Sequence, residues 1–262
     1  LAALVNEGIR AVRELLPETK VMIHLDQGGR YNCIMPWFDS MFNAGMLPID
    51  AIGLSFYSFW HGTFMDLKDT MSRLIKLYNL PVYIVETAHP WRHCKGEHIS
   101  KELMETAGLD AGSAEQKKSL EIIMQIAAEV SKDTGKTGVY YWEPVGVPGK
   151  VMGTWFENMG MFDEHGRALP GWDAIRDFDP KNPPIKELDK YIESLYEYEE
   201  TPEVEDFMKL LMIHGNLISN PEFKDGFNNW QIETSLEERQ YTLGKDGVFI
   251  SSDANFDYSI SQ

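Results

Sequence analysis

Residues 81–91, PVYIVETAHPW, carry most of the information about the architecture of this chain. The segment starts as a short run of Val, Ile and Tyr, which favour buried strands, and it ends in polar and aromatic side chains. Three further runs of this kind occur: KVMIHL (20–25), AIGLSFY (51–57) and GVYYWE (138–143). Nearly continuous apolar runs predict strands covered on both faces, as in a parallel sheet.

Helical patterns precede each of the four predicted strands, with apolar residues recurring three and four positions apart. The expected helices are LAALVNEGIRAVRELLP (1–17), MPWFDSMFNAG (35–45), FMDLKDTMSRLIKLYN (64–79) and AEQKKSLEIIMQIAAEVSKDTG (114–135). The alternation of strands and helices predicts an α/β fold with a parallel sheet. The first helix is already under way at the first residue, without an initiator Met or a basic leader, so we expect the chain to begin inside a domain.

Polar and aromatic residues gather directly after each predicted strand. In parallel α/β folds, ligands bind beyond the carboxyl ends of the strands, so we expect these side chains to converge on one face. Neither G-x-G-x-x-G nor G-x-x-x-x-G-K-[ST] occurs in the sequence, which favours a (β/α)8 TIM barrel over a doubly wound nucleotide-binding sheet. Because a closed barrel takes eight strands and about 250 residues, the four strands predict about half of one.

The composition is that of a globular protein, with 43% apolar and 25% charged residues. The chain has 24 basic and 41 acidic residues, and a formal charge of −17 makes nucleic acid an unexpected partner. No uninterrupted apolar run reaches the length of about 18 residues that would predict a membrane span. Cys33 and Cys94 allow at most one disulfide, and the sequence leaves open whether it forms.

A change in composition near residue 178 predicts a domain boundary. Residues 1–178 hold 23 acidic and 17 basic side chains, whereas residues 179–262 hold 18 and 7. Three prolines follow within residues 180–184, and proline continues neither a helix nor a strand ladder. We expect the barrel segment at 1–178, an acidic linker with a helix at 179–214, and the start of a β-sandwich at 215–262.

Two glutamates, Glu86 and Glu143, end successive predicted strands. Paired carboxylates beside aromatic side chains are typical of glycosidic-bond chemistry. Flat indole rings provide stacking faces for sugars, and four of them follow the strands: Trp60, Trp91, Trp142 and Trp155. A glutamate at a strand end more often caps a loop or pairs with a base, but the apolar strand and the aromatic neighbours favour a functional role for Glu86.

A set of motifs resembles the second half of glycoside hydrolase family 53, the arabinogalactan endo-β-1,4-galactanases. They are VMIHLDQG, AIGLSFYSFW, VETAHPW, GVYYWEP and GTWFENMGMFDEHGRALPGW, in this order and at this spacing. The resemblance covers residues 1 to about 178. It implies a (β/α)8 barrel whose strands five to eight are the four predicted here, and hydrolysis with retention of anomeric configuration through a covalent glycosyl-enzyme.

The resemblance also implies roles for individual residues. It makes Glu86 the nucleophile and places the general acid/base in an Asn-Glu pair upstream of this chain; Asn6-Glu7 lies inside a helix and is not that pair. It makes Glu143, which carboxylate pairing alone would suggest as acid/base, a sugar contact or a supporting residue. The implied sugar subsites are lined by His24, Asp26, Tyr57, Trp60, Trp142 and Trp155, although Trp155 suits core packing equally well. His89 and Trp91, which flank Glu86, are further candidate substrate contacts.

The segment HPWRHCKGEH brings together His89, His93, Cys94 and His98, but the spacing is irregular and loop-like, so we expect no zinc. Some relatives hold calcium through Asp and Asn in these loops; this sequence departs from that pattern and does not support calcium. The expected partner is β-1,4-galactan or arabinogalactan, a polymer that implies a secreted or cell-surface protein.

Two alternatives to the galactanase stay open. One is a glycan-binding protein without catalysis, and the other is a retaining barrel glycosidase that acts on another β-linked polysaccharide. An upstream Asn-Glu pair that ends an apolar strand would favour the enzyme over the binding protein, and the release of reducing sugar from β-1,4-galactan against xylan, mannan and cellulose would separate the two glycosidases.

The tail offers one further resemblance. NLISNPEF (216–223), followed by a Gly and by Trp230, is similar to the opening of a carbohydrate-binding module of the β-sandwich type.

Overall fold

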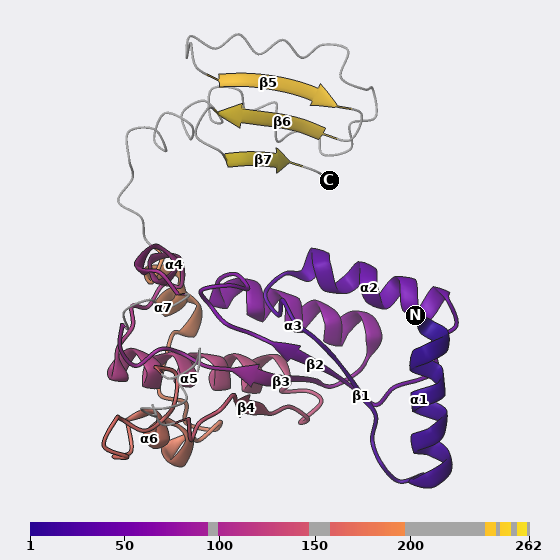
Figure 1. Cartoon of the computed structure of the whole chain (residues 1–262), viewed down its shortest axis with the longest axis horizontal. Coiled ribbons are helices and arrows are strands. Elements are labelled where there is room, and N and C mark those ends of the chain that lie inside the picture. Colours follow the sequence, from indigo (N-terminus) through magenta and orange to yellow (C-terminus); the bar gives the residue numbers. More distant parts are fainter. Residues whose placement is uncertain (94–98, 147–157, 197–238, 245–246, 253–255, 261–262) are drawn as a thin grey trace. The chain divides into compact units, whose positions relative to one another are not determined.

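The computed structural model describes residues 1–93, 99–146, 158–196, 239–244, 247–252 and 256–260. The chain forms two compact units, Leu1–Tyr198 and Glu199–Gln262, which are described separately (Figure 1). Of the residues discussed above, Cys94, His98, Trp155 and Trp230 lie outside the described part of the chain.

The first unit is built on a parallel sheet with the order β1-β2-β3-β4, so strands that are consecutive in sequence are neighbours in space (Figure 1). The strands are β1 (Met22–Leu25), β2 (Ala51–Ser55), β3 (Val82–Thr87) and β4 (Val139–Tyr141). Each lies within the predicted run or extends one residue beyond it. The order advances in one direction without a reversal, as in a barrel, whereas a doubly wound sheet reverses at a switch point.

Helices precede and follow the strands. They are α1 (Ala2–Leu15), α2 (Tyr31–Asn43), α3 (Phe64–Tyr78), α4 (Lys101–Thr106), α5 (Ser113–Val130), α6 (Gly171–Asp177) and α7 (Leu188–Ser194). The four predicted helices correspond to α1, α2, α3 and α5. Helix α2 starts at Tyr31, four residues before the predicted start, so Pro36 lies inside it.

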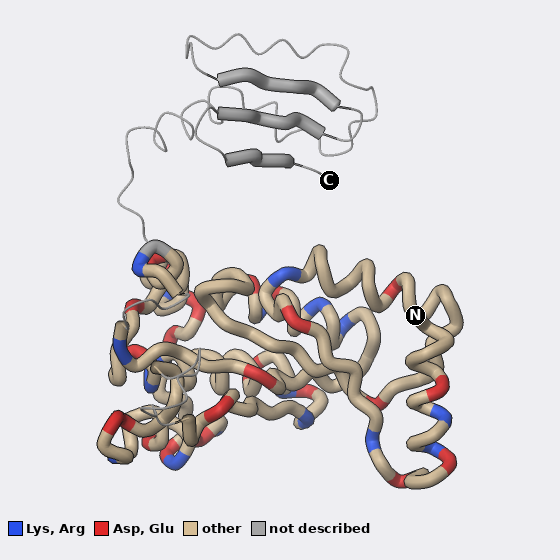
Figure 2. Tube along the Cα trace, in the orientation of Figure 1, with Lys and Arg blue, Asp and Glu red and all other residues tan. Residues whose placement is uncertain are grey.

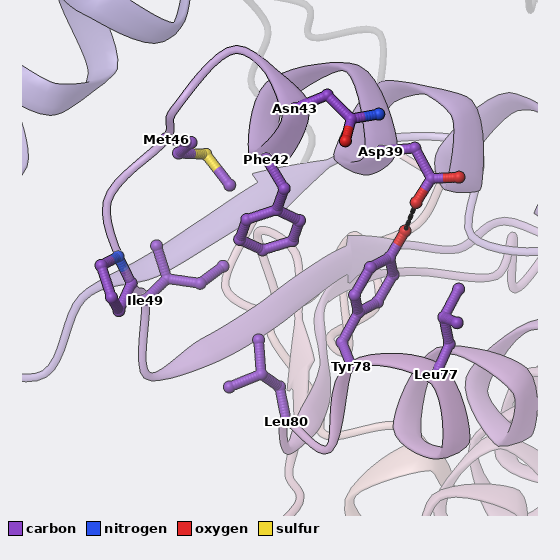
Figure 3. A pocket seen from close by; sticks show the side chains of 9 residues that line it. Asp39, Phe42, Asn43, Met46, Ile49, Leu77, Tyr78 and Leu80 are labelled. Carbon is purple, nitrogen blue, oxygen red and sulfur yellow. Dashed lines mark hydrogen bonds between the residues drawn. The ribbon is translucent and has the colours of Figure 1, made fainter.

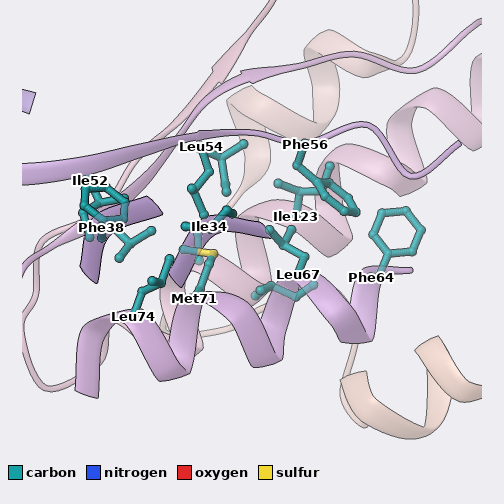
Figure 4. Packing of buried hydrophobic residues seen from close by; sticks show 14 of the residues in the cluster. Ile34, Phe38, Ile52, Leu54, Phe56, Phe64, Leu67, Met71, Leu74 and Ile123 are labelled. Carbon is teal, nitrogen blue, oxygen red and sulfur yellow. The ribbon is translucent and has the colours of Figure 1, made fainter. Parts of the chain in front are cut away.

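The main core lies between the sheet and the helices that pack against it (Figure 4). Helix α3 contacts both α2 and α5, as expected for the outer helix layer of a barrel. Phe38, Leu54, Leu67 and Met71 are fully buried there, and burying side chains of this size contributes roughly 1.5–3 kcal/mol each. This packing supports a TIM-barrel-like α/β fold and fixes the strands from their outer side.

Helix α7 lies within the segment that the sequence assigned to the acidic linker. Its Leu188 and Ile192 are buried in the main core, and α7 contacts α3. The first compact unit therefore continues past residue 178, to Tyr198. The remainder of the predicted linker lies outside the described residues.

The second unit contains an antiparallel sheet with the order β5-β6-β7. Its strands are β5 (Arg239–Gly244), β6 (Gly247–Ser252) and β7 (Phe256–Ile260). Three antiparallel strands are compatible with the start of a sandwich, which stays a prediction.

Acidic and basic residues are interspersed over the helices and loops of the first unit (Figure 2). Within the ranges that the structure describes, no helix is both long and apolar enough to cross a membrane.

Candidate active site

Glu86 lies near the carboxyl end of β3, where an irregularity in strand pairing places it beside β2. Leu54 pairs with Ile84, but the next residue of β2, Ser55, pairs with Glu86, so β3 contains one extra residue. The pairing of β3 with β4 shifts over the same stretch, between Ile84 and Thr87. An extra residue bends a strand and changes the direction of the side chains that follow it. Here it brings Glu86 level with Ser55.

Two hydroxyl groups hold the carboxylate of Glu86, one on each oxygen. Tyr57 donates from its hydroxyl to Oε1 at 2.7 Å, and Ser55 donates from Oγ to Oε2 at 2.9 Å. Hydrogen bonds to a carboxylate stabilise its charged form, which is the form that acts as a nucleophile. The side chain of Glu86 remains 23% exposed, so a ligand can reach it.

Tyr57 is a permanent donor to this carboxylate. Its pKa is raised above the ordinary tyrosine value, first because burial disfavours the phenolate and then because its hydroxyl donates to Glu86; the charge of Glu143 adds to the effect. The ring packs edge-on against Trp60 and His61, with centroid distances of 5.4 and 5.5 Å. The hydroxyl therefore stays protonated and fixed in place.

The loop after β1 closes tightly on the end of β2. The N–H of Gly28 donates to the carbonyl oxygen of Ser55 at 2.8 Å, and a Cβ at Gly28 would lie 2.7 Å from that oxygen. A Cβ at Gly29 would lie 2.2 Å from the carbonyl oxygen of His61. Real Cβ atoms do not approach oxygen this closely, so only glycine fits at these two positions. Nδ1 of His61 lies 3.0 Å from the same carbonyl of Ser55 and, because a carbonyl only accepts, carries the proton.

Of two further predicted sugar contacts, His24 lies close to this carboxylate and Trp60 lies beside Tyr57. Nε2 of His24 is 2.7 Å from Oγ of Ser55 and 4.0 Å from Oε2 of Glu86. Trp60 is half-buried beside Tyr57, and its carbonyl oxygen accepts a hydrogen bond from the guanidinium of Arg30 at 2.9 Å.

Three predicted sugar contacts are exposed at the ends of β1 and β4. Trp142 is 42% exposed, and its backbone N–H donates to Thr87 at 2.8 Å, which ties the end of β4 to β3. Asp26 and Glu143 are exposed next to these strand ends. Glu143, and Gln27 after β1, have positive φ angles of 49° and 62°. Non-glycine residues in this left-handed region occur preferentially at functional sites.

His89 and Trp91 follow β3 but engage the loops. His89 is 1% exposed, and its Nε2 donates to the carbonyl oxygen of Asp110 at 2.9 Å, so its ring offers no surface to a sugar in this structure. Trp91 is half-buried, with the guanidinium of Arg92 stacked 4.4 Å from its ring. Its backbone N–H donates to Asn158 at 2.8 Å and thereby joins the loops after β3 and β4. Their roles in substrate binding stay predictions.

Ser55 is the site residue that the sequence did not suggest. It stands inside the apolar run AIGLSFY, where a serine resembles an ordinary strand residue. Its position at the end of the strand, two residues before Tyr57, was the feature that could have marked it as a site residue.

A cavity of about 490 Å³ lies at the opposite ends of the strands, lined by residues of α2, of α3 and of the segments before β2 and β3 (Figure 3). Its only described carboxylate, Asp39, accepts a hydrogen bond from the hydroxyl of Tyr78 at 2.8 Å. In barrel folds the amino ends of the strands serve stability rather than chemistry, so this cavity is not the candidate active site.

Among the described residues, no group of three or more His, Cys, Asp or Glu side chains could hold a metal ion. His93 is paired with Asp110 at 2.7 Å instead. Cys33 is exposed, and because Cys94 lies outside the described residues, the question of a disulfide stays open.

A one-directional parallel β/α unit, with a hydroxyl-held glutamate and exposed aromatic side chains at its strand ends, fits the class of TIM-barrel-like glycoside hydrolases. Residues 1–175 match the model of Glycosyl hydrolase family 53, and the chain belongs to this family. The match confirms the resemblance drawn from the sequence motifs.

Relatives with known sequences or structures match about two thirds of the chain. An uncharacterised protein of Niallia circulans is 36% identical over 186 residues, covering 67% of this chain and 50% of that protein. An arabinogalactan endo-β-1,4-galactanase of Cellvibrio japonicus is 31% identical over 183 residues, covering 65% and 48%. The solved family 53 catalytic domain from Ignisphaera aggregans superposes with a TM-score of 0.60 and 29% identity, covering 67% and 51%. The chain thus spans about half the length of the relatives it matches.

Proposed function

We propose that the protein containing this chain is an endo-acting, retaining hydrolase of β-1,4-galactosidic bonds in galactan or arabinogalactan, with Glu86 as its nucleophile. The observation that carries the proposal is the carboxylate of Glu86 at a strand end, with one hydroxyl donor on each oxygen. The substrate class is supported by relatives that are named arabinogalactan endo-β-1,4-galactanases.

The proposed reaction has two steps. One oxygen of Glu86 bonds to the anomeric carbon while the glycosidic bond breaks, and the leaving oxygen takes a proton from the general acid. Water then attacks the same carbon and returns its proton to that residue, while Glu86 departs as a carboxylate. By the family resemblance, the acid/base belongs to the strand that precedes the four described here.

Exposed groups beyond the strand ends are proposed as sugar contacts. Trp142, with its exposed indole, and Trp60, beside Tyr57, suit stacking against galactose rings. Asp26 and Glu143, both exposed next to strand ends, are proposed to accept hydrogen bonds from sugar hydroxyls. A polymeric substrate also favours a secreted or cell-surface location, since a polysaccharide does not enter a cell.

The first experiment incubates the full-length protein with β-1,4-galactan, arabinogalactan, xylan, mannan and cellulose and measures the release of reducing sugar. We expect galacto-oligosaccharides of several lengths from the two galactans only. Release from another polymer alone would assign a different substrate, and binding without release would favour a glycan-binding protein.

The second experiment tests Glu86 directly. Glu86→Gln should lower kcat by about a thousandfold or more while substrate binding persists, because the amide cannot form the glycosyl ester. Glu187→Gln, an exposed position before α7 that pairs with Lys190, is the matched control and should retain activity. A fluorinated galactoside should label Glu86, and a label on any other side chain would contradict the assignment.

A further inference from the structure

We propose that His24 and Ser55 form a hydrogen-bonded relay that positions the carboxylate of Glu86. This role differs from the sugar contact that the sequence suggests for His24, and it rests on the proposed function of Glu86 as the nucleophile. The relay runs from Nε2 of His24 to Oγ of Ser55, 2.7 Å away, and from there to Oε2 of Glu86, at 2.9 Å. His24, Ser55 and Glu86 come from three adjacent strands, β1, β2 and β3.

The chemistry of the three groups fixes the direction of both hydrogen bonds. The carboxylate of Glu86 can only accept, so the single hydroxyl proton of Ser55 points toward Oε2. Oγ of Ser55 can then offer only a lone pair to His24, and Nε2 of His24 must carry the proton. The relay therefore requires the Nε2–H form of the imidazole. With its proton at Nε2 committed to Ser55, His24 has only Nδ1 left for any other polar partner.

Ser55 is held firmly enough to transmit this constraint. It is 3% exposed, and its carbonyl oxygen accepts hydrogen bonds from the N–H of Gly28 and from Nδ1 of His61. The extra residue in β3 then brings Glu86 level with this fixed side chain. The backbone at Ser55 is thus fixed from the loop side, and its hydroxyl is oriented from the β1 side.

The relay complements Tyr57, which holds the other oxygen of the carboxylate. Two donors on two oxygens define the plane of the carboxylate, whereas a single donor would allow it to rotate. Attack on an anomeric carbon requires the reacting oxygen to be aligned with that carbon. Ser55 therefore acts on the nucleophile directly, and His24 is a positioning residue that acts through Ser55.

The test uses the full-length protein and measures the rate at which an activated 2-deoxy-2-fluoro-galactoside labels Glu86. This rate reports formation of the glycosyl-enzyme and needs no polysaccharide. Ser55→Ala should slow labelling by about 10- to 100-fold, the effect of losing a hydrogen bond to a charged group. Ser55→Thr, which keeps the hydroxyl, should recover most of the rate.

A double-mutant cycle separates the relay from a sugar contact. His24→Leu should slow labelling in the wild-type background and have little further effect in Ser55→Ala, because its action passes through the hydroxyl. His24→Gln, whose amide can donate in place of Nε2, should retain more of the rate than His24→Leu. Additive effects of the two substitutions, or no effect of Ser55→Ala, would overturn the relay.

An independent readout is the tautomer of His24, observed by NMR with selectively ¹⁵N-labelled histidine. The wild type should show the Nε2–H form at His24, and Ser55→Ala should shift the tautomer balance, while the exposed His165 remains unchanged as an internal control. A tautomer at His24 that does not respond to Ser55→Ala would overturn the relay. Absence of labelling in the wild type would instead contradict the proposed function and leave the NMR result to decide the relay.

Discussion

The hydroxyl of Tyr57 is a single group whose removal tests how the nucleophile is held. Tyr57→Phe keeps the ring contacts with Trp60 and His61 but leaves Oε1 of Glu86 without its donor. We expect kcat on galactan to fall by about 10- to 100-fold, because a hydrogen bond to a charged group contributes about 1.5–3 kcal/mol. Steady-state kinetics of the full-length protein would measure the change.

Tyr78→Phe is the matched control for this substitution. It removes a hydroxyl that also donates to a carboxylate, that of Asp39, but at the amino ends of the strands (Figure 3). Activity should stay within about twofold of the wild type, since this site takes no part in the chemistry. Equal losses in both variants would show that Tyr57 acts through general stability.

His89 predicts a pH dependence of stability. Burial lowers its pKa to about 4, so the folded protein holds a neutral ring where the unfolded chain, with a pKa near 6.5, takes up a proton. Between these two values the unfolded state binds more protons, so the free energy of unfolding decreases as the pH falls. Above about pH 6.5 the ring is neutral in both states, and His89 does not lower the free energy of unfolding. Near pH 4 the lowering approaches about 3 kcal/mol.

The measurement is urea unfolding at a series of pH values. His89→Gln, whose amide can still donate to the carbonyl oxygen of Asp110, should flatten the slope between pH 6.5 and about 4. His165→Gln, at an exposed histidine, should leave the slope unchanged. A steep slope that persists in His89→Gln would assign the acid sensitivity to other groups.

Among the elements, helix α5 supplies one side chain that joins three segments next to the site. Nε2 of the buried Gln116, which carries two hydrogens, lies within hydrogen-bond distance of three acceptors: the carbonyl oxygens of His89 at 2.9 Å and Gly160 at 3.1 Å, and the hydroxyl of Tyr141 at 3.0 Å. Gln116→Glu would place acceptors against acceptors and should lower the free energy of unfolding by at least about 2 kcal/mol. Urea unfolding at neutral pH would measure it. Ala114→Gln, exposed on the same helix, should change stability by less than about 0.5 kcal/mol; an equal loss would contradict the role of Gln116.

The elements were predictable from sequence where the signal is local. The apolar runs located all four strands of the first sheet because strands covered on both faces need nearly continuous apolar sequence. The start of α2 was misplaced because Pro36 resembles the first turn of a helix, whereas the helix begins at Tyr31, just after the Gly28-Gly29 turn. The family motifs pointed to Glu86 and Tyr57, and the structure brings their side chains into hydrogen-bond contact.

The pairing between strands was not predictable, because it is set by contacts between distant residues. The extra residue in β3 leaves no trace in PVYIVET, yet it decides that Glu86 stands beside Ser55. For the same reason the buried state of His89 was missed: its environment comes from Asp110 and from α5, far along the chain.

For the first unit as a whole, two strand edges and several large apolar side chains are left uncovered by the described residues. Strands β1 and β4 are the outer strands, each with one unpaired edge among the described strands. Tyr140 on β4 is 58% exposed, and Leu4 on α1 is 75% exposed. In a closed barrel the two edges would pair with further strands, and such side chains would be covered. The relatives, about twice as long as the matched segment, supply that additional length.

We therefore predict different behaviour for residues 1–262 expressed alone and for the full-length protein. The isolated chain should self-associate, because open edges and apolar faces favour association. It should release no sugar from β-1,4-galactan, because the family resemblance places the acid/base upstream of these residues. Light scattering and a reducing-sugar assay would measure both properties.

Co-expression with the preceding part of the full-length protein should restore a monodisperse, active species if the two parts close one barrel. A monomeric isolated chain that hydrolyses galactan would show that the carboxylates described here are sufficient, and would return Glu143 to consideration as the acid/base.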